Sequence, residues 1–227
     1  MVVEVGSRLR GQFIRRLSLR GRRSIWEPAY LYFQQERERA ILALLGRHGF
    51  NPMTNTKVLE IGCGSGAVLA DFLRFGVPPS NAVGIDVDER RVADASERYP
   101  QLEFRHADAA RIPFPDRSFD LVLAFTVFSS IPDPAHRSLV ANEVLRVLRP
   151  GGAVLWYDFW INPINSETKA LGIAEIRRLF GREPTEARRV TLAPPIARLL
   201  AKRSWIACEL LSKVLIFRTH WLALVRA

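Results

Sequence analysis

Cysteine, lysine and long apolar runs are all scarce in this sequence. Its two cysteines, Cys63 and Cys208, are too few for a disulfide scaffold or a cysteine-rich zinc site. It has no run of about 18 apolar residues that would make a transmembrane helix. Arginines 8, 10, 15 and 16 interrupt the apolar core that a signal peptide needs, so we expect a cytoplasmic protein. No metal site is predicted, because no HxxxH pair or carboxylate cluster of useful spacing occurs.

The remaining composition is typical of a folded domain: 227 residues, 48% hydrophobic and 25% charged. A formal charge of +10 raises the question of nucleic acid, but its distribution is uneven. Residues 1–50 carry 10 basic and 4 acidic groups (net +6), residues 51–150 carry 11 and 13 (net −2), and residues 151–227 carry 12 and 6 (net +6). Only four of the 33 basic residues are lysines. A uniform nucleic-acid-binding face would not leave the middle acidic, so the basicity belongs to the flanks.

The first 26 residues form a basic N-terminal arm in which apolar residues such as Leu9, Phe13 and Leu17 stand among arginines. This arm is either an amphipathic helix that lies on an anionic surface or a mobile segment broken by Gly11 and Gly21. The spacing of apolar residues then predicts a helix over residues 27–47.

Short apolar strands alternate with helical stretches along the middle of the chain. Strands are predicted at 57–61, 81–87, 102–106, 119–125 and 153–159, and helices at 67–75, 88–99 and 136–148. Such alternation implies right-handed crossovers and a parallel sheet. The predicted fold class is therefore α/β.

The strongest local motif is VLEIGCGSG at residues 58–66. Glycines directly after a first strand let the backbone approach a ligand at the carboxyl edge of the sheet. The motif also satisfies the dinucleotide-binding pattern, with Asp86 at the distance expected for a ribose-binding acid, and a tight turn without a ligand is a third interpretation.

Four segments in order resemble the class I S-adenosylmethionine-dependent methyltransferases: VLEIGCGSG, GIDVD (84–88), HADAARIPFPDRSFDLV (106–122) and LRVLRPGG (145–152). The resemblance implies a Rossmann-like, seven-stranded, mainly parallel sheet with an antiparallel last strand and helices on both faces. A single methyltransferase domain would cover residues 27–227. Its strands six and seven would lie at 188–192 and 219–225, with a helical insertion at 193–218 between them.

The resemblance also implies the cofactor S-adenosyl-L-methionine, with S-adenosyl-L-homocysteine as product. Asp86 would bind the ribose hydroxyls, Asp108 would face the adenine amine, and Glu60 suits a sulfonium cation better than a pyrophosphate. The full predicted set of cofactor-binding residues is Glu60, Gly62, Cys63, Gly64, Asp86, Val87, Asp108, Ala109 and Phe125.

The motifs that follow the fourth strand in related methyltransferases are different here. Ser129-Ser130-Ile131 stands where small-molecule enzymes often have an EHI-like triplet, and the DPPY-like signature of amino-group enzymes is absent. For a hydroxyl acceptor a general base is needed. We rank Asp158 first, His136 second, and also consider Tyr157, while Tyr30 and His220 are weaker candidates.

The aromatic and amide-rich segment 156–167 favours O-methylation of a small-molecule acceptor, either sugar-containing or amphiphilic. Together with the arm, segment 193–218 would form a lid or a surface for an amphiphilic or membrane-associated acceptor; a dimer contact or extra core is the alternative. An RNA or ribosomal methyltransferase, a non-catalytic cofactor-binding subunit and a dehydrogenase are competing hypotheses. Nucleic acid is not expected as a partner, and the protein is expected to be a monomer or a homodimer.

Overall fold

The computed structural model describes residues 24–161 and 170–227. Almost all of the predicted N-terminal arm, and residues 162–167 of the aromatic segment, therefore lie outside the described residues.

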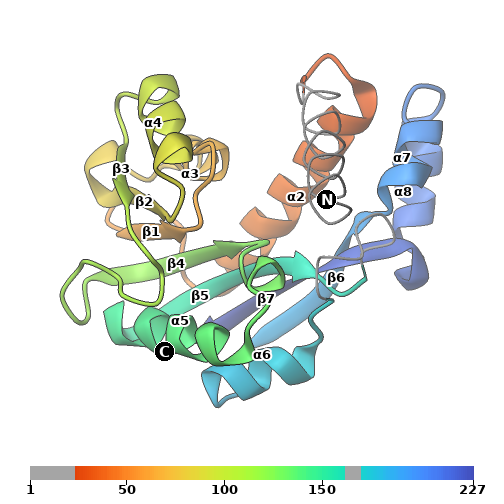
Figure 1. Ribbon diagram of the computed structural model, residues 1–227. Helices are drawn as coiled ribbons and strands as arrows, with labels where there is room; N and C mark the ends of the chain where they lie inside the picture. The colour runs from red at the N-terminus through yellow and green to blue at the C-terminus, as the bar shows by residue number, and fades with distance from the viewer. Residues whose placement is uncertain (1–23, 162–169) are drawn as a thin grey trace, which may run out of the picture.

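Seven strands form one twisted sheet in the order β3-β2-β1-β4-β5-β7-β6 (Figure 1). The strands are β1 (Val58–Ile61), β2 (Ala82–Asp86), β3 (Glu103–His106), β4 (Phe119–Phe125), β5 (Leu148–Phe159), β6 (Glu186–Leu192) and β7 (Arg218–Arg226). Strands β1 to β5 are parallel to one another, whereas β7 runs antiparallel to both β5 and β6. This arrangement confirms the predicted Rossmann-like sheet with an antiparallel last strand. Its order reverses between β1 and β4, where ligands of open α/β sheets usually bind.

Helices cover both faces of the sheet. They are α2 (Pro28–Arg47), α3 (Ala67–Arg74), α4 (Glu89–Arg98), α5 (Pro134–Val147), α6 (Ile173–Phe180), α7 (Pro194–Leu200) and α8 (Trp205–Ser212), with short 3-10 helices η1 (Pro79–Asn81), η2 (Phe128–Ser130) and η3 (Leu215–Phe217). In Figure 1, α5 and α6 lie together below the sheet and α2 crosses its other side, while α7 and α8 stand at the β6 edge.

Each face of the sheet has its own hydrophobic core. On one side Ile41 and Leu44 of α2 and Phe72 of α3 pack on alternate strand residues. On the other side Val144 of α5 and Ile176 of α6 pack on the intervening residues. Because successive strand residues point to opposite faces, strand parity decides which side chains reach which layer.

Most predicted bounds agree with the structure to within two residues, and three elements show why the others differ or begin elsewhere. Helix α5 begins at Pro134 because the Asp133 carboxylate caps it, accepting hydrogen bonds from Ala135 N at 3.0 Å and His136 N at 3.2 Å. Strand β5 begins at Leu148, five residues earlier than the predicted strand. Helix α6 was not predicted; it has only eight residues, and its burial of Ile176, Leu179 and Phe180 provides the stabilisation that so short a helix lacks by itself.

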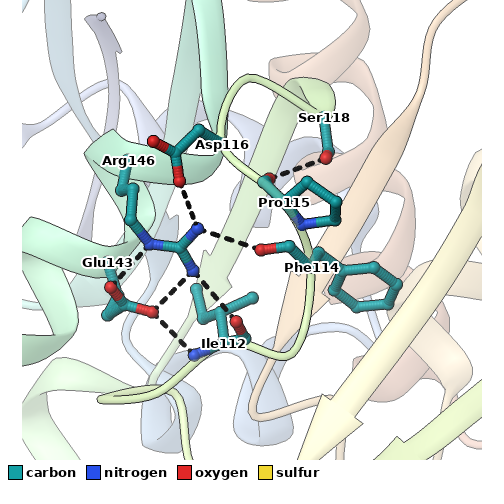
Figure 2. A network of polar contacts seen from close by, with 7 residues as sticks. All are labelled: Ile112, Phe114, Pro115, Asp116, Ser118, Glu143 and Arg146. Carbon is teal, nitrogen blue, oxygen red and sulfur yellow. Dashed lines mark hydrogen bonds and ion pairs between the residues drawn. The ribbon is translucent and has the colours of Figure 1, made fainter.

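The Arg146 guanidinium joins two of the sequence motifs (Figure 2). From α5, it donates to the Glu143 carboxylate at 2.7 and 2.8 Å and to Asp116 Oδ1 at 2.7 Å. It also donates to the carbonyl oxygens of Ile112 and Phe114, both at 2.9 Å. Glu143 completes the network by accepting from Ile112 N at 2.8 Å. The loop between β3 and β4, which contains Asp108, is thereby fixed to α5.

We predict that Arg146→Gln lowers the free energy of unfolding by about 2 kcal/mol, because it removes charge-assisted hydrogen bonds and leaves loop carbonyls without their donor. Urea denaturation at neutral pH measures this. The ion pair lowers the pKa of Glu143, so its contribution is complete above the ordinary glutamate pKa and is lost as the pH falls through the lowered value. The difference between wild type and variant should therefore shrink at acid pH.

Arg177→Gln is the matched control. Arg177 forms a solvent-exposed ion pair with Glu183, and such pairs contribute about 0–1 kcal/mol. An Arg146 variant as stable as this control would show that the network does not hold the loop.

Candidate functional site

One large cavity lies at the carboxyl ends of β1, β2, β4 and β5, with a volume of about 1330 Å³. Its walls come from the turn after β1, the loops after β2, β3 and β4, one side of α2, and residues of β6, β7 and α7. It therefore spans the reversal point of the sheet, and its two ends differ in chemistry.

Glu60 lies at the floor of one end of the cavity, 2% exposed. Its carboxylate accepts a hydrogen bond from Leu69 N, in the first turn of α3, at 3.0 Å. Gly62, at φ +60°, turns the chain beside it, and a Cβ there would lie 2.8 Å from a Val127 methyl group. Burial raises the pKa of Glu60 well above its ordinary value. A phosphate would need the backbone amides at the start of α3, and the Glu60 carboxylate already accepts from the Leu69 amide there. The turn therefore suits a cationic ligand better than a phosphate.

Asp86, at the end of β2, connects the glycine turn that follows β1 to β2 through hydrogen bonds of its carboxylate. Its carboxylate accepts from Gly64 N at 2.8 Å and from Asp88 N at 2.9 Å, and the side chain lines the cavity. Two neighbouring members of the predicted cofactor set border it. Val87 is 69% exposed on the cavity wall, and burial raises the pKa of the Cys63 thiol.

Asp108 and His136 meet at the far side of this end. Asp108 accepts from Ala110 N at 2.8 Å, and His136 Nε2 lies 3.4 Å from Asp108 Oδ1. Both side chains line the cavity, as does Ala109. His136, which we predicted as a second-ranked base, thus stands beside the residue predicted to contact the cofactor's adenine.

A row of aromatic rings crosses the strand ends at the opposite end of the cavity. Phe125 of β4 stacks on Tyr157 of β5 at a centroid distance of 5.3 Å, and Tyr157 stacks on His220 of β7 at 4.5 Å. Phe159 packs on the other side of His220 at 4.1 Å. All four side chains line the cavity. The row forms an apolar wall with polar atoms only at the Tyr157 hydroxyl and the imidazole.

Hydrogen bonding determines the tautomer of His220. The Thr219 hydroxyl donates to the Thr191 carbonyl oxygen at 3.3 Å, so its oxygen accepts from His220 Nδ1–H at 2.9 Å. Nε2 then carries the lone pair, and no described residue bonds to it. Burial and the nearby Arg37 lower the pKa of His220 to about 3, so the ring is neutral at physiological pH.

Tyr157 is buried and bonded at its hydroxyl. That oxygen lies 2.6 Å from Thr191 Oγ1, and burial raises the pKa of the phenol to about 12. The group therefore stays protonated at neutral pH, where it can share a proton in a hydrogen bond but carries no charge to act as a base.

Asp158, our first-ranked candidate base, points to the other face of the sheet. It is fully buried, and its carboxylate accepts from Ser129 N at 3.0 Å and Phe159 N at 2.8 Å. Burial raises its pKa to about 6. The side chain is not among the described residues that line the cavity. The strand pleat explains this placement, because Tyr157 and Phe159 occupy the cavity face and Asp158 lies between them.

Arg37 is a cavity residue that the sequence interpretation missed. It projects from α2, pairs with Asp71 at 3.0 Å, and stands 5.9 Å from the centre of the Phe125 ring. A signal was available, since Arg37 precedes the buried Ile41 and Leu44 by four and seven residues and so lies on the inward face of the helix. Tyr30, about two helical turns earlier, also lines the cavity.

Two threonines in the cavity wall have left-handed backbone conformations: Thr126 with φ 55° and Thr191 with φ 68°. This region is unfavourable for β-branched residues and costs of the order of 1–3 kcal/mol each. Thr126 follows β4, and Thr191 lies within β6 next to Tyr157. Such strain concentrates at functional sites, and here both instances border the aromatic end.

Comparison with known proteins agrees with this geometry. The family profile described as "Methyltransferase domain" matches residues 58–152. A probable S-adenosylmethionine-dependent methyltransferase of Mycolicibacterium smegmatis is 41% identical over 137 residues, which is 54% of this chain and 49% of that protein.

Two further relatives carry more specific names. A phthiotriol/phenolphthiotriol dimycocerosates methyltransferase of Mycobacterium ulcerans is 35% identical over 58% of this chain and 48% of its own length. A 27-O-demethylrifamycin SV methyltransferase of Amycolatopsis mediterranei is 33% identical over 53% of this chain and 45% of its own length. The chain thus spans about half the length of the curated relatives it matches.

Among solved structures, a putative sarcosine dimethylglycine methyltransferase from Galdieria sulphuraria superposes with a TM-score of 0.63 at 19% identity, covering 84% of each chain. At this identity the similarity concerns the fold. The profile match over the glycine turn and the acids at the strand ends identifies residues 58–152 as a methyltransferase domain, and the chain is similar to S-adenosylmethionine-dependent methyltransferases.

Proposed function

We propose that this protein is an S-adenosylmethionine-dependent methyltransferase that methylates a hydroxyl group of a small, amphiphilic molecule. The observation that carries the proposal is the division of one cavity into two ends. Glu60, Asp86 and Asp108 line one end, and the neutral row of Phe125, Tyr157 and His220 lines the other.

The charged end fits the family's cofactor. Glu60 and Arg37 provide an anion and a cation for the zwitterionic methionine moiety, while Asp86 and Asp108 accept from the ribose hydroxyls and the adenine amine. Gly62, Cys63 and Gly64 of the predicted set also line the cavity beside Glu60, whereas Phe125 belongs to the aromatic row. When bound, the cofactor supplies an electrophilic methyl group and a neutral thioether as leaving group.

The neutral end fits an apolar acceptor with a hydroxyl. We assign His220 Nε2 as the atom that accepts the hydrogen bond from this hydroxyl, orients its oxygen and takes its proton. The aromatic neighbours hold the imidazole rigidly and exclude water. The imidazole therefore contributes more by aligning the acceptor hydroxyl than by being a strong base. His220 replaces Asp158 in this role because it is His220 whose side chain lines the cavity.

Charge favours a small molecule over RNA. The described lining of the cavity carries five acidic residues, Glu27, Glu60, Asp86, Asp94 and Asp108, and four basic residues, Arg37, Arg91, Arg98 and Arg198. A channel for a polyanion would carry a clear excess of positive charge. The names of the relatives, which refer to phthiotriol and phenolphthiotriol dimycocerosates and to a demethylated rifamycin, support a small-molecule acceptor. We also propose a cytoplasmic protein that contacts membranes peripherally.

The first test is transfer of a radiolabelled methyl group to a panel of long-chain alcohols, alkylphenols and ribosomal RNA. Methylation of a hydroxylated amphiphile by the protein alone supports the proposal, and mass spectrometry of the product identifies an O-methyl group. Exclusive labelling of RNA or of a carbon atom contradicts the assigned acceptor. A requirement for a partner subunit contradicts the proposal that the chain is itself the enzyme.

We predict that S-adenosylhomocysteine binds more tightly as the pH rises toward the raised pKa of Glu60. The ligand's ammonium group favours the carboxylate over the carboxylic acid, so binding releases a proton. Calorimetry in two buffers of different ionisation enthalpy measures the number of protons released on binding. Glu60→Gln should abolish the pH dependence and weaken binding roughly 10- to 100-fold. Asp94→Asn, at the exposed part of the cavity wall, is the control and should retain the dependence.

We predict that His220→Phe lowers kcat on the methylated panel compound by about 10²- to 10⁴-fold and leaves S-adenosylhomocysteine affinity within about twofold. Phenylalanine preserves the ring stack but has no proton acceptor. Because the pKa of His220 is about 3, its ring is already deprotonated between pH 5 and 8, and its titration should not raise the wild-type rate in that range. An unchanged kcat in His220→Phe would overturn the assignment, and ¹⁵N NMR independently checks that Nδ1 carries the proton.

A further inference from the structure

The segment between β6 and β7 exposes an unusual number of large apolar side chains. Ile206 is 74% exposed and Ile216 is 71% exposed. We define the 199–216 apolar face as Leu199, Trp205, Ile206, Leu210, Val214, Leu215 and Ile216, all exposed in the described structure. Exposed apolar groups concentrated in one short segment mark an interaction surface, whereas single ones do not.

Helix α8 is apolar on both of its sides. Its inner side buries Cys208 against Ala197 of α7 and Tyr32 of α2. On its outer side Ile206 and Leu210 are four residues apart and therefore adjacent, and Val214 continues their direction just beyond the helix. The inner side accounts for the packing of the helix, so the outer apolar residues serve no internal core.

Positive charge surrounds this face. Arg198, Lys202, Arg203 and Lys213 are exposed, and no ion pair joins them to a described acidic side chain. The single acid of α8, Glu209, pairs instead with Arg39 of α2 at 3.2 Å. Apolar side chains among unpaired basic ones match a membrane interface that contains anionic lipid. A symmetric contact with a second copy would bring these like charges together, which disfavours that occupant.

The face is connected to the cavity through α7 and α2. Pro194 and Arg198 of α7 line the cavity, and so do Tyr30 and Phe33 of α2. Trp205, part of the face, packs edge-on against Tyr32 at 5.8 Å. A molecule held in a lipid surface at this face would therefore lie close to a wall of the cavity.

We infer that the 199–216 apolar face and its four basic side chains dock the protein onto an anionic lipid surface, from which an amphiphilic acceptor enters the cavity. Only the second clause rests on the proposed function. Docking itself needs neither cofactor nor acceptor, so the two ideas can fail separately.

The test is co-sedimentation of the full-length protein with vesicles of phosphatidylcholine alone or mixed with phosphatidylglycerol. We expect binding to the mixed vesicles, at least tenfold weaker binding to phosphatidylcholine, and weakening by added salt. Lys202→Glu with Arg203→Glu should reduce binding by more than 20-fold, since each basic side chain near an anionic surface contributes about fivefold. Ile206→Asp with Leu210→Asp should reduce it similarly.

Matched controls carry the same substitutions elsewhere on the surface. Arg90→Glu with Arg111→Glu changes charge equally, and Leu139→Asp changes an apolar residue that is 54% exposed on α5. These variants should bind vesicles like wild type. Each face variant is also checked for S-adenosylhomocysteine binding without vesicles, which separates loss of docking from loss of folding.

Three outcomes would overturn the inference: no binding to the mixed vesicles, equal loss in the control variants, or a wild-type dimer that Ile206→Asp with Leu210→Asp converts to a monomer. The last result, from analytical ultracentrifugation, would assign the face to a second copy. Normal vesicle binding without methylation of any amphiphile would instead contradict the proposed function.

Discussion

A buried carboxylate is the constraint on which this architecture depends. Glu60 stands beneath the glycine turn, where an ionised group is costly unless nearby groups compensate it. Helix α3 contributes the Leu69 amide, and helix α2 contributes the positive charge of Arg37, which is itself held by Asp71 of α3. The same acid therefore positions two helices and gives the floor of the cavity its preference for a cation. A neutral residue here would remove both effects at once.

From Glu60 on β1 to His220 on β7, the side chains that line the cavity change from charged groups to stacked rings. The change follows strand parity: Glu60, Phe125, Tyr157 and His220 all point to the α2 side, while Trp156 and Asp158 point to the α5 side. Burial and the nearby positive charge of Arg37 keep the His220 imidazole neutral, and its polar partner is Thr219 and not an acid. Strained backbone at Thr126 and Thr191 borders this end, where the surrounding contacts hold two residues in conformations they would not adopt alone.

Much of this could be predicted from the sequence, within a clear limit. The α/β fold class and the acids at strand ends follow from motifs whose positions are local in the chain, and the structure places Glu60, Asp86 and Asp108 around one cavity. The face of the sheet to which a side chain points was harder to predict. We ranked Asp158 first because it lies where strand five opens onto the cleft, but a shift of one residue along a strand exchanges the two faces. Arg37 and His220 reach the cavity from α2 and β7, which lie far apart in the chain, so only tertiary packing brings them together. Arg146 illustrates the same point, since its partners lie some thirty residues away.

The structure also gives part of the positive charge of the chain a role in holding the fold together. Several arginines use their forked donors to hold backbone carbonyls of distant elements: Arg218 binds the carbonyls of Arg189 and Ser212, and Arg226 binds those of Gly151 and His48. A lysine presents a compact, strongly hydrated charge and could not replace such a fork, which gives a physical reason for the scarcity of lysine. Two of the four lysines, Lys202 and Lys213, lie instead beside the exposed apolar residues of the β6–β7 segment. Four exposed basic side chains without a described ion pair thus stand beside exposed apolar surface, a combination that suits the anionic lipid surface we propose better than nucleic acid.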